Sequence, residues 1–261
     1  MTAWTYRSAL AALGGAQKAA ARGAPAYSRF VNRRLGRFLA AGAAAAGLTP
    51  NAVTGISAVF TLSGIAVLAL APWGLATGAV VTLLLLVGYA FDSADGQLAR
   101  LRGGGSPAGE WLDHVVDSLK VSALPLAVFV GLVRHGEQDA AVLAIPLVAT
   151  VVAAVSFFTM ILTEQLRRAH GAVPLAPSGG GSRAWIRSVI AIPTDYGVQC
   201  FTFLLLGVVP LFLVVYGAIL VASTVYLLMA CVKWYRELSA LPARPQPARK
   251  PSPGRPAQRR R

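Results

Sequence analysis

Four aspartates stand in two pairs within the most apolar part of this chain. The chain has six aspartates in all, and Asp92, Asp95, Asp113 and Asp117 are four of them. An ionised carboxylate at membrane depth costs roughly 2–3 kcal/mol on insertion scales, so acidic residues there usually serve a function. Carboxylate oxygens suit hard cations such as Mg²⁺ or Mn²⁺. The four residues therefore predict a centre for two metal ions, the arrangement that clamps a phosphoryl group.

Each pair of aspartates shares one helical face with small residues. The positions that share a face are Asp92, Asp95, Gly96 and Ala99 in the first set, and Gly109, Asp113 and Asp117 in the second. Gly96 and Ala99 leave a hollow in which a flat ligand can approach the helix closely. Arg100, directly beyond, is placed to pair with a phosphate or to orient an aspartate. With no second histidine and no cysteine nearby, the pattern argues against zinc.

The composition is that of an integral membrane protein. The 261 residues are 56% hydrophobic and only 13% charged. The formal net charge is +14, but no aromatic and basic residues alternate as they do on a nucleic-acid platform, so we expect no nucleic-acid partner. Cys200 and Cys231 lie in apolar segments and predict no disulfide. The N-terminus lacks the apolar core and cleavage site of a secretory signal.

The hydropathy pattern predicts an all-α integral membrane bundle of six transmembrane helices, preceded by an amphipathic interfacial helix. Residues 1–24 are expected to be a flexible segment, 25–48 an amphipathic juxtamembrane helix, 49–238 the six-helix catalytic domain, and 239–261 a disordered basic Pro/Arg tail. The expected spans are 51–71, 75–99, 106–133, 140–163 and two from the apolar run 198–232, divided at Gly207 and Pro210. Ser106 and Pro107 form an N-cap and first-turn pair for the third span.

The basic residues predict the orientation of this bundle. Of the 24 Lys and Arg residues, all except Arg134 and Lys120 lie in segments that share one side if six spans place both termini together. By the positive-inside rule that side is the cytoplasm, and the aspartates lie at the cytoplasmic ends of the second and third spans. We therefore expect a bacterial inner-membrane protein whose basic juxtamembrane helix contacts anionic lipids.

The motif D-x2-D-G-x2-A-R-x8-G-x3-D-x3-D resembles the signature of the CDP-alcohol phosphatidyltransferases, integral membrane enzymes of phospholipid synthesis. All eight signature positions match, and the resemblance is strong over residues 49–125. It implies a six-span bundle with a cytoplasm-facing site. It also implies transfer of a phosphatidyl or other substituted phosphoryl group from a CDP-linked donor to an alcohol acceptor, with release of CMP. Because family members are often dimeric, it implies a homodimer.

The resemblance assigns roles to individual residues. Asp92, Asp95, Asp113 and Asp117 would hold two divalent ions, and Asp117 would also deprotonate the acceptor hydroxyl. Gly96, Ala99 and Arg100 would line the CDP pocket. Asn51 and Thr54, in the pattern Thr-Pro-Asn-x-x-Thr, match a family pattern and would touch the nucleotide. The alternative for Asn51 is that it caps the first span.

For several further residues the sequence leaves two possible roles open. His114 either assists proton transfer beside a metal ligand or packs against another helix. Lys120, one turn after Asp117, either offsets carboxylate charge or contacts a substrate phosphate. Arg183 and Arg187, with the basic pair before them, either bind a phosphorylated headgroup or fix the topology. Gly109 is a signature position without a further assigned role.

The acceptor is left open by the sequence. The run from Gly109 to His114 partly resembles the aminoalcohol phosphotransferase branch, whereas residues 27–33 resemble a branch that joins inositol phosphates. A CDP-aminoalcohol or CDP-inositol-type reaction is therefore an alternative. A divalent-cation or proton-coupled transporter and a non-catalytic membrane scaffold are the other classes. Acids at one end of the spans, without an internal repeat, disfavour a transporter, and the intact motif disfavours a scaffold.

Overall fold

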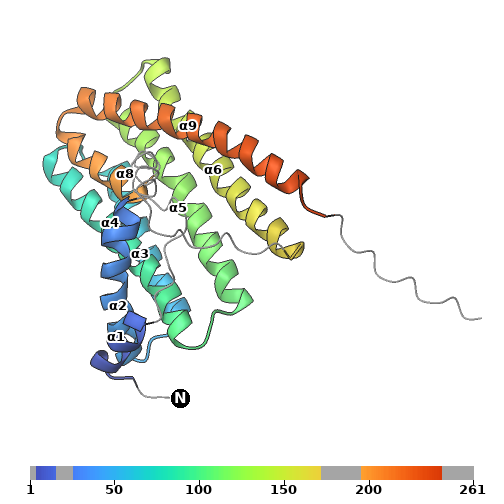
Figure 1. Ribbon diagram of the computed structural model, residues 1–261. Helices are drawn as coiled ribbons and strands as arrows, with labels where there is room; N and C mark the ends of the chain where they lie inside the picture. The colour runs from blue at the N-terminus through green and yellow to red at the C-terminus, as the bar shows by residue number, and fades with distance from the viewer. Residues whose placement is uncertain (1–3, 16–25, 172–194, 243–261) are drawn as a thin grey trace, which may run out of the picture.

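Helices make up all the regular structure in the part of the chain that the computed structural model describes, residues 4–15, 26–171 and 195–242 (Figure 1). The elements are α1 (Tyr6–Gly15), the π-helical turn η1 (Ser28–Asn32), α2 (Arg33–Ala45), α3 (Pro50–Leu70), α4 (Leu75–Leu101), α5 (Pro107–Arg134), α6 (Ala140–Ala169), α8 (Tyr196–Thr202), the 3₁₀ turn η3 (Phe203–Gly207) and α9 (Val209–Ser239). The predicted all-α class is confirmed.

Five of these helices are long and apolar enough to cross a membrane: α3, α4, α5, α6 and α9, with 21 to 31 residues each. They identify an integral membrane protein built as a helical bundle. The first three predicted spans are confirmed to within two residues at each end. The fourth continues as α6 to Ala169, beyond the expected end, and includes Pro146.

The fifth predicted span is different in the structure. The described residues there form the shorter apolar pair α8 and η3, Tyr196–Gly207, so the described ranges hold five rather than six helices of spanning length. This pair lies along α4, where Thr82 donates a hydrogen bond of 3.0 Å to the carbonyl of Cys200. A Cβ atom on Gly78 would lie 2.2 Å from the carbonyl oxygen of Phe203, so glycine permits this close approach. The predicted break near Gly207 is confirmed.

Local side chains begin the helices that carry the motif. Thr49 caps α3 by accepting a hydrogen bond of 3.1 Å from the N–H of Ala52. The alternative that Asn51 is the cap is therefore wrong, because Asn51 already lies within the helix. Ser106 caps α5 through the N–H of Gly109 at 3.0 Å, as predicted.

Two buried clusters hold the bundle together. The larger one joins α3, α4, α5, α8, η3 and α9. The smaller one joins α1 and α2 to α3 and α4, and it includes Ala9 and Leu13 of α1. The N-terminal segment, expected to be flexible, thus contains a helix packed on the bundle.

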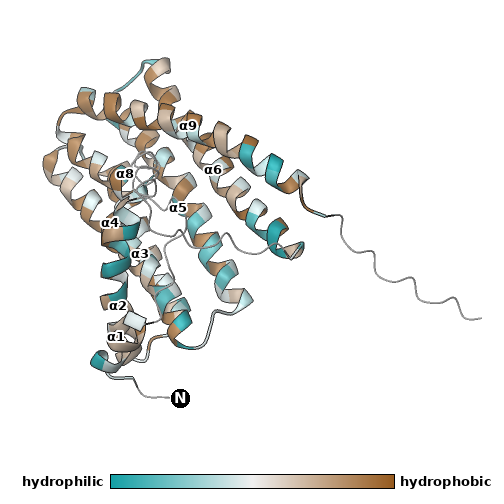
Figure 2. Ribbon diagram, in the orientation of Figure 1, coloured by the Kyte–Doolittle hydropathy of each residue, from teal (hydrophilic) through white to brown (hydrophobic). Residues whose placement is uncertain are grey.

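The juxtamembrane segment has the predicted amphipathic pattern. Phe30, Leu35 and Phe38 are exposed, whereas Ala40 and Ala44 on the opposite side are buried against the bundle. Figure 2 shows that hydrophilic residues gather at the C-terminal ends of α4, α6 and α9 and at the N-terminal end of α5. Most of the predicted basic tail lies outside the described residues.

Candidate active site

The turn between α4 and α5 brings the two aspartate pairs together. Asp92 of α4 and Asp117 of α5 share one cation, because Lys120 Nζ lies 2.9 Å from Asp92 Oδ1 and 2.5 Å from Asp117 Oδ1. Lys120 is only 7% exposed. A sequence separation of 25 positions thus becomes direct proximity at the polar end of the bundle.

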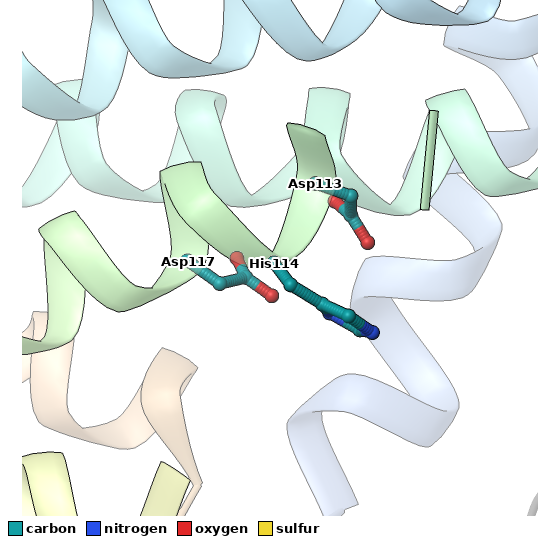
Figure 3. Close-up of side chains that lie close together, drawn as sticks. All are labelled: Asp113, His114 and Asp117. Carbon is teal, nitrogen blue, oxygen red and sulfur yellow. The ribbon is translucent and has the colours of Figure 1, made fainter. Parts of the chain in front are cut away.

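Asp113, His114 and Asp117 form a compact group on α5 (Figure 3). One ligand atom from each of the three lies within 4.8 Å of the others. His114 Nδ1 and Asp117 Oδ1 are buried atoms without a hydrogen-bond partner among the described residues, although Asp117 keeps its ion pair with Lys120. Carboxylate oxygens from two helices, α4 and α5, fit a site for hard divalent cations.

His114 both packs against another helix and lies beside carboxylates. Its ring makes an edge-to-face contact with Phe157 of α6 at a centroid distance of 6.3 Å. Its Nε2 also lies 3.8 Å from Glu110 Oε1. The side chain therefore packs on a neighbouring helix and at the same time borders the carboxylates.

Asp95 is the most buried of the four aspartates and is fixed by α3. It is 5% exposed, and its Oδ2 accepts a hydrogen bond of 2.6 Å from the hydroxyl of Thr54. The carboxylate also interacts electrostatically with Asp92 and Asp113. Thr54, predicted to touch the nucleotide, is itself buried and orients a candidate metal ligand.

The predicted nucleotide hollow lies at the end of α4. A Cβ atom on Gly96 would meet only Arg100 Nη1, at 3.5 Å, so the backbone is open there. Arg100 is exposed, and Ala99 is half-buried. Asn51 borders α5, because its Oδ1 would lie 3.0 Å from a Cβ atom on Gly109. The predicted Arg183 and Arg187 lie outside the described residues.

Asp195, directly before Tyr196, is a buried aspartate to which we had assigned no role. It is fully buried and caps α8 through the N–H of Gly197 at 3.1 Å. It also accepts hydrogen bonds from the N–H of Tyr27 at 2.7 Å and of Ser28 at 3.4 Å. Burial raises the pKa of the Asp195 carboxyl, and these backbone donors oppose the shift. An aspartate directly before an apolar run is an N-cap pattern and could have indicated the first of these contacts.

Tyr196 connects the charged site to an apolar cavity. Its ring centroid lies 5.7 Å from Lys120 Nζ, and its ring packs edge-on against Tyr89 at 5.0 Å. The same side chain lines a cavity of about 420 Å³ between α5, α6, α8 and α9, whose walls are mainly apolar and include Leu124 and Leu227. The site therefore has a charged side and an adjoining apolar cavity.

Ion pairs connect the polar ends of α5, α6 and α9. Arg168 lies 2.5 Å from Glu110 and also pairs with Glu164. Arg167 Nη1 lies 2.8 Å from Glu237 Oε2. Both arginines are therefore engaged by glutamates, so headgroup binding by them would compete with these pairs.

A comparison with known protein families identifies the family of this chain. The family model of the CDP-alcohol phosphatidyltransferases matches residues 47–235, most of the chain and all of the site. The chain belongs to this family.

A curated relative matches a shorter part of the chain. A phosphatidylinositol phosphate synthase of Mycobacterium marinum (strain ATCC BAA-535 / M) is 39% identical over 102 residues, which cover 39% of this chain and 42% of that protein. The match thus spans less than half of that relative's length.

A solved structure with a TM-score of 0.50 has a similar fold. The phosphatidylinositol phosphate synthase of Mycobacterium tuberculosis with CDP-DAG bound has a TM-score of 0.50 and 23% identity, covering 81% of this chain and 95% of that one. The same enzyme in complex with manganese and citrate has a TM-score of 0.47 and 24% identity, covering 78% and 88%.

Proposed function

We propose that the protein transfers a phosphatidyl group from CDP-diacylglycerol to the hydroxyl of an alcohol and releases CMP. Membership of the CDP-alcohol phosphatidyltransferases supports this reaction class. The observation that carries the proposal is the convergence of carboxylates from α4 and α5 on one shared cation at the polar end of an apolar bundle. Few other functions explain buried acids at that position.

The donor is proposed to be a lipid because of the cavity beside the charged group. Tyr196 borders both Lys120 and the apolar space of about 420 Å³. A space of that size accepts part of an acyl chain, while the polar head lies among the aspartates. Reacting groups would then meet at the membrane boundary, with the lipid tails left in the bilayer.

Asp92, Asp95, Asp113 and Asp117 are proposed to hold two Mg²⁺ or Mn²⁺ ions. Four carboxylates in a site of low dielectric need counter-charge beyond the single ammonium group of Lys120. Bound ions would neutralise the pyrophosphate and favour CMP as the leaving group.

The chain's own residues would then position and deprotonate the acceptor. Asp117 accepts the proton of the acceptor hydroxyl while the oxygen of that hydroxyl forms a bond to the phosphatidyl phosphorus. The bond from that phosphorus to the bridging oxygen breaks, and CMP leaves with the electron pair. Gly96, Ala99 and Arg100 would line the nucleotide, with Asn51 at its edge and Thr54 holding Asp95. Most of the rate would come from positioning and charge stabilisation.

The topology is proposed to have six crossings. The Arg167–Glu237 pair joins the C-terminal ends of α6 and α9, so α9 begins at the opposite end of the bundle. This placement supports a sixth crossing between Ala169 and Val209, of which α8 and η3 would form part. With basic residues at the inner side, the site and both termini would face the cytoplasm of a bacterial plasma membrane. A homodimer and contacts of α2 with anionic lipids complete this proposal.

The acceptor is best found with a panel. Purified full-length protein would be incubated with radiolabelled CDP-diacylglycerol, Mg²⁺ or Mn²⁺, and glycerol phosphate, serine, inositol or inositol phosphate, while CMP and labelled lipid are measured. The assay would be repeated with CDP-aminoalcohols and CDP-inositol. We expect metal-dependent CMP release with one donor class. No release with any donor would refute the transferase proposal and favour transport or a scaffold.

Asp117→Asn should abolish CMP release while leaving the fold intact, because the amide cannot accept the proton. Asp139→Asn is the matched control, since Asp139 caps α6 at the opposite end of α5 from the site. Turnover by Asp117→Asn near the wild-type rate would remove its role as base.

A further inference from the structure

Lys120 is a buried lysine held between candidate metal ligands on two helices. Its ammonium group contacts Asp92 Oδ1 at 2.9 Å and Asp117 Oδ1 at 2.5 Å, and it lies 5.7 Å from the centroid of the Tyr196 ring. The side chain is 9% exposed. Asp113, about two turns earlier on α5, also interacts with it electrostatically. The lysine thus supplies positive charge at the position where the proposed function needs divalent ions.

The ammonium group of Lys120 and a divalent ion cannot both bind the same carboxylate oxygen atoms at the same time. Mg²⁺ requires carboxylate oxygens at about 2.0–2.1 Å in strict geometry. The ammonium group of Lys120 already occupies the approach to one oxygen of Asp92 and one of Asp117. Lysine is a compact charge on a flexible four-carbon stem, so it can withdraw while its backbone stays in α5.

We propose that Lys120 is a displaceable internal counter-ion of the metal site. In the metal-free protein it holds Asp92 and Asp117 together across α4 and α5, and it competes with divalent cations for both carboxylates. This inference rests on the proposed function, because it assumes that these aspartates bind metal. Its consequence is a site of moderated metal affinity, which fills more readily when the pyrophosphate of a donor adds negative charge. Lys120 is a positioning residue in this account.

Manganese binding tests the competition directly and without turnover. Free Mn²⁺ is followed by electron paramagnetic resonance during titration of the full-length protein in detergent, without substrate. Lys120→Met should tighten Mn²⁺ binding at least tenfold. Lys233→Met, which removes an exposed lysine near Glu237, should leave the affinity unchanged. An unchanged or weaker affinity of Lys120→Met would overturn the inference, because Lys120 would then not compete with the metal.

A second measurement uses the wild-type protein, in case Lys120→Met does not fold. Amine acetylation at Lys120, read by mass spectrometry, should rise several-fold when Mn²⁺ is added, while acetylation at Lys233 stays constant. No rise at Lys120 would overturn the displacement. If the wild-type protein binds no Mn²⁺, or if Asp113→Ala leaves binding unchanged, the proposed metal site itself fails together with this inference. If the wild-type protein binds Mn²⁺ but the acetylation of Lys120 does not change, only the displacement of Lys120 is refuted, and the proposed metal site stands.

Discussion

The contact between Thr54 and Asp95 offers a sharp test of how the site is assembled. Thr54→Val replaces the hydroxyl by a methyl group of similar volume and removes the donor to Asp95 Oδ2, which lies 2.6 Å away. Both residues are buried, Thr54 at 4% and Asp95 at 5% exposure, so water cannot readily replace the lost hydrogen bond. The carboxylate would keep its charge but lose the group that orients it.

The size of the effect follows from the type of bond. A hydrogen bond to a charged group is worth about 1.5–3 kcal/mol. Since about 1.4 kcal/mol corresponds to a factor of ten, Thr54→Val should weaken Mn²⁺ binding about tenfold to a hundredfold, and kcat/KM should fall by a similar factor. The loss of metal binding should appear without any CDP donor, because Thr54 acts through Asp95.

Ser57→Ala is the matched control on the same helix. Ser57 donates a buried hydrogen bond of 2.8 Å to the carbonyl of Gly88, so it joins α3 to α4 without touching an aspartate. Its removal should cost about 0.5–1.5 kcal/mol of stability and leave Mn²⁺ affinity unchanged. The assay is a Mn²⁺ titration by electron paramagnetic resonance beside thermal unfolding in detergent. Wild-type Mn²⁺ affinity in Thr54→Val, or an equal loss in Ser57→Ala, would refute the reasoning.

Two further predictions concern the attachment of the N-terminal helices. Asp195→Ala leaves three buried or part-buried backbone N–H groups without their acceptor and should lower stability by about 2–4 kcal/mol, against about 1 kcal/mol for Asp139→Ala at an exposed cap. Equal shifts in the thermal midpoint would contradict that ranking. Gly36→Ala places a Cβ atom 2.7 Å from Ser93 Oγ and should lower the midpoint by separating α2 from α4. Gly42→Ala, which meets nothing within 4 Å, should stabilise α2 by up to about 1 kcal/mol, and a loss there would disprove the packing argument.

The elements that carry the motif were predictable because their signals are local. Continuous apolar runs bounded by Thr49-Pro50 and Ser106-Pro107 define the ends of α3 and α5, and capping needs only the next few residues. The division of the last apolar run was also predicted. The length of its first half was not, because hydropathy reports how apolar a segment is and cannot report that η3 tightens the helix beside α4.

Contacts between distant segments could not be predicted in the same way. Asp195 accepts hydrogen bonds from Tyr27 and Ser28, which lie more than 160 positions earlier in the chain. The packing of α1 depends similarly on a surface made by α2 and α4. Neither arrangement leaves a periodic pattern in the residues that make it.

Sequence alone determined the membrane-spanning character and the face of each helix on which the aspartates lie, because helical periodicity and apolar length are properties of neighbouring residues. The resemblance of the aspartate motif to a known signature indicated the family. The tertiary structure decided which group contacts each carboxylate. Thr54 donates a hydrogen bond to Asp95, and Lys120 forms ion pairs with both Asp92 and Asp117. Such pairings depend on the crossing of α3, α4 and α5. That crossing is set by side-chain packing over the whole bundle and is not encoded in any one segment.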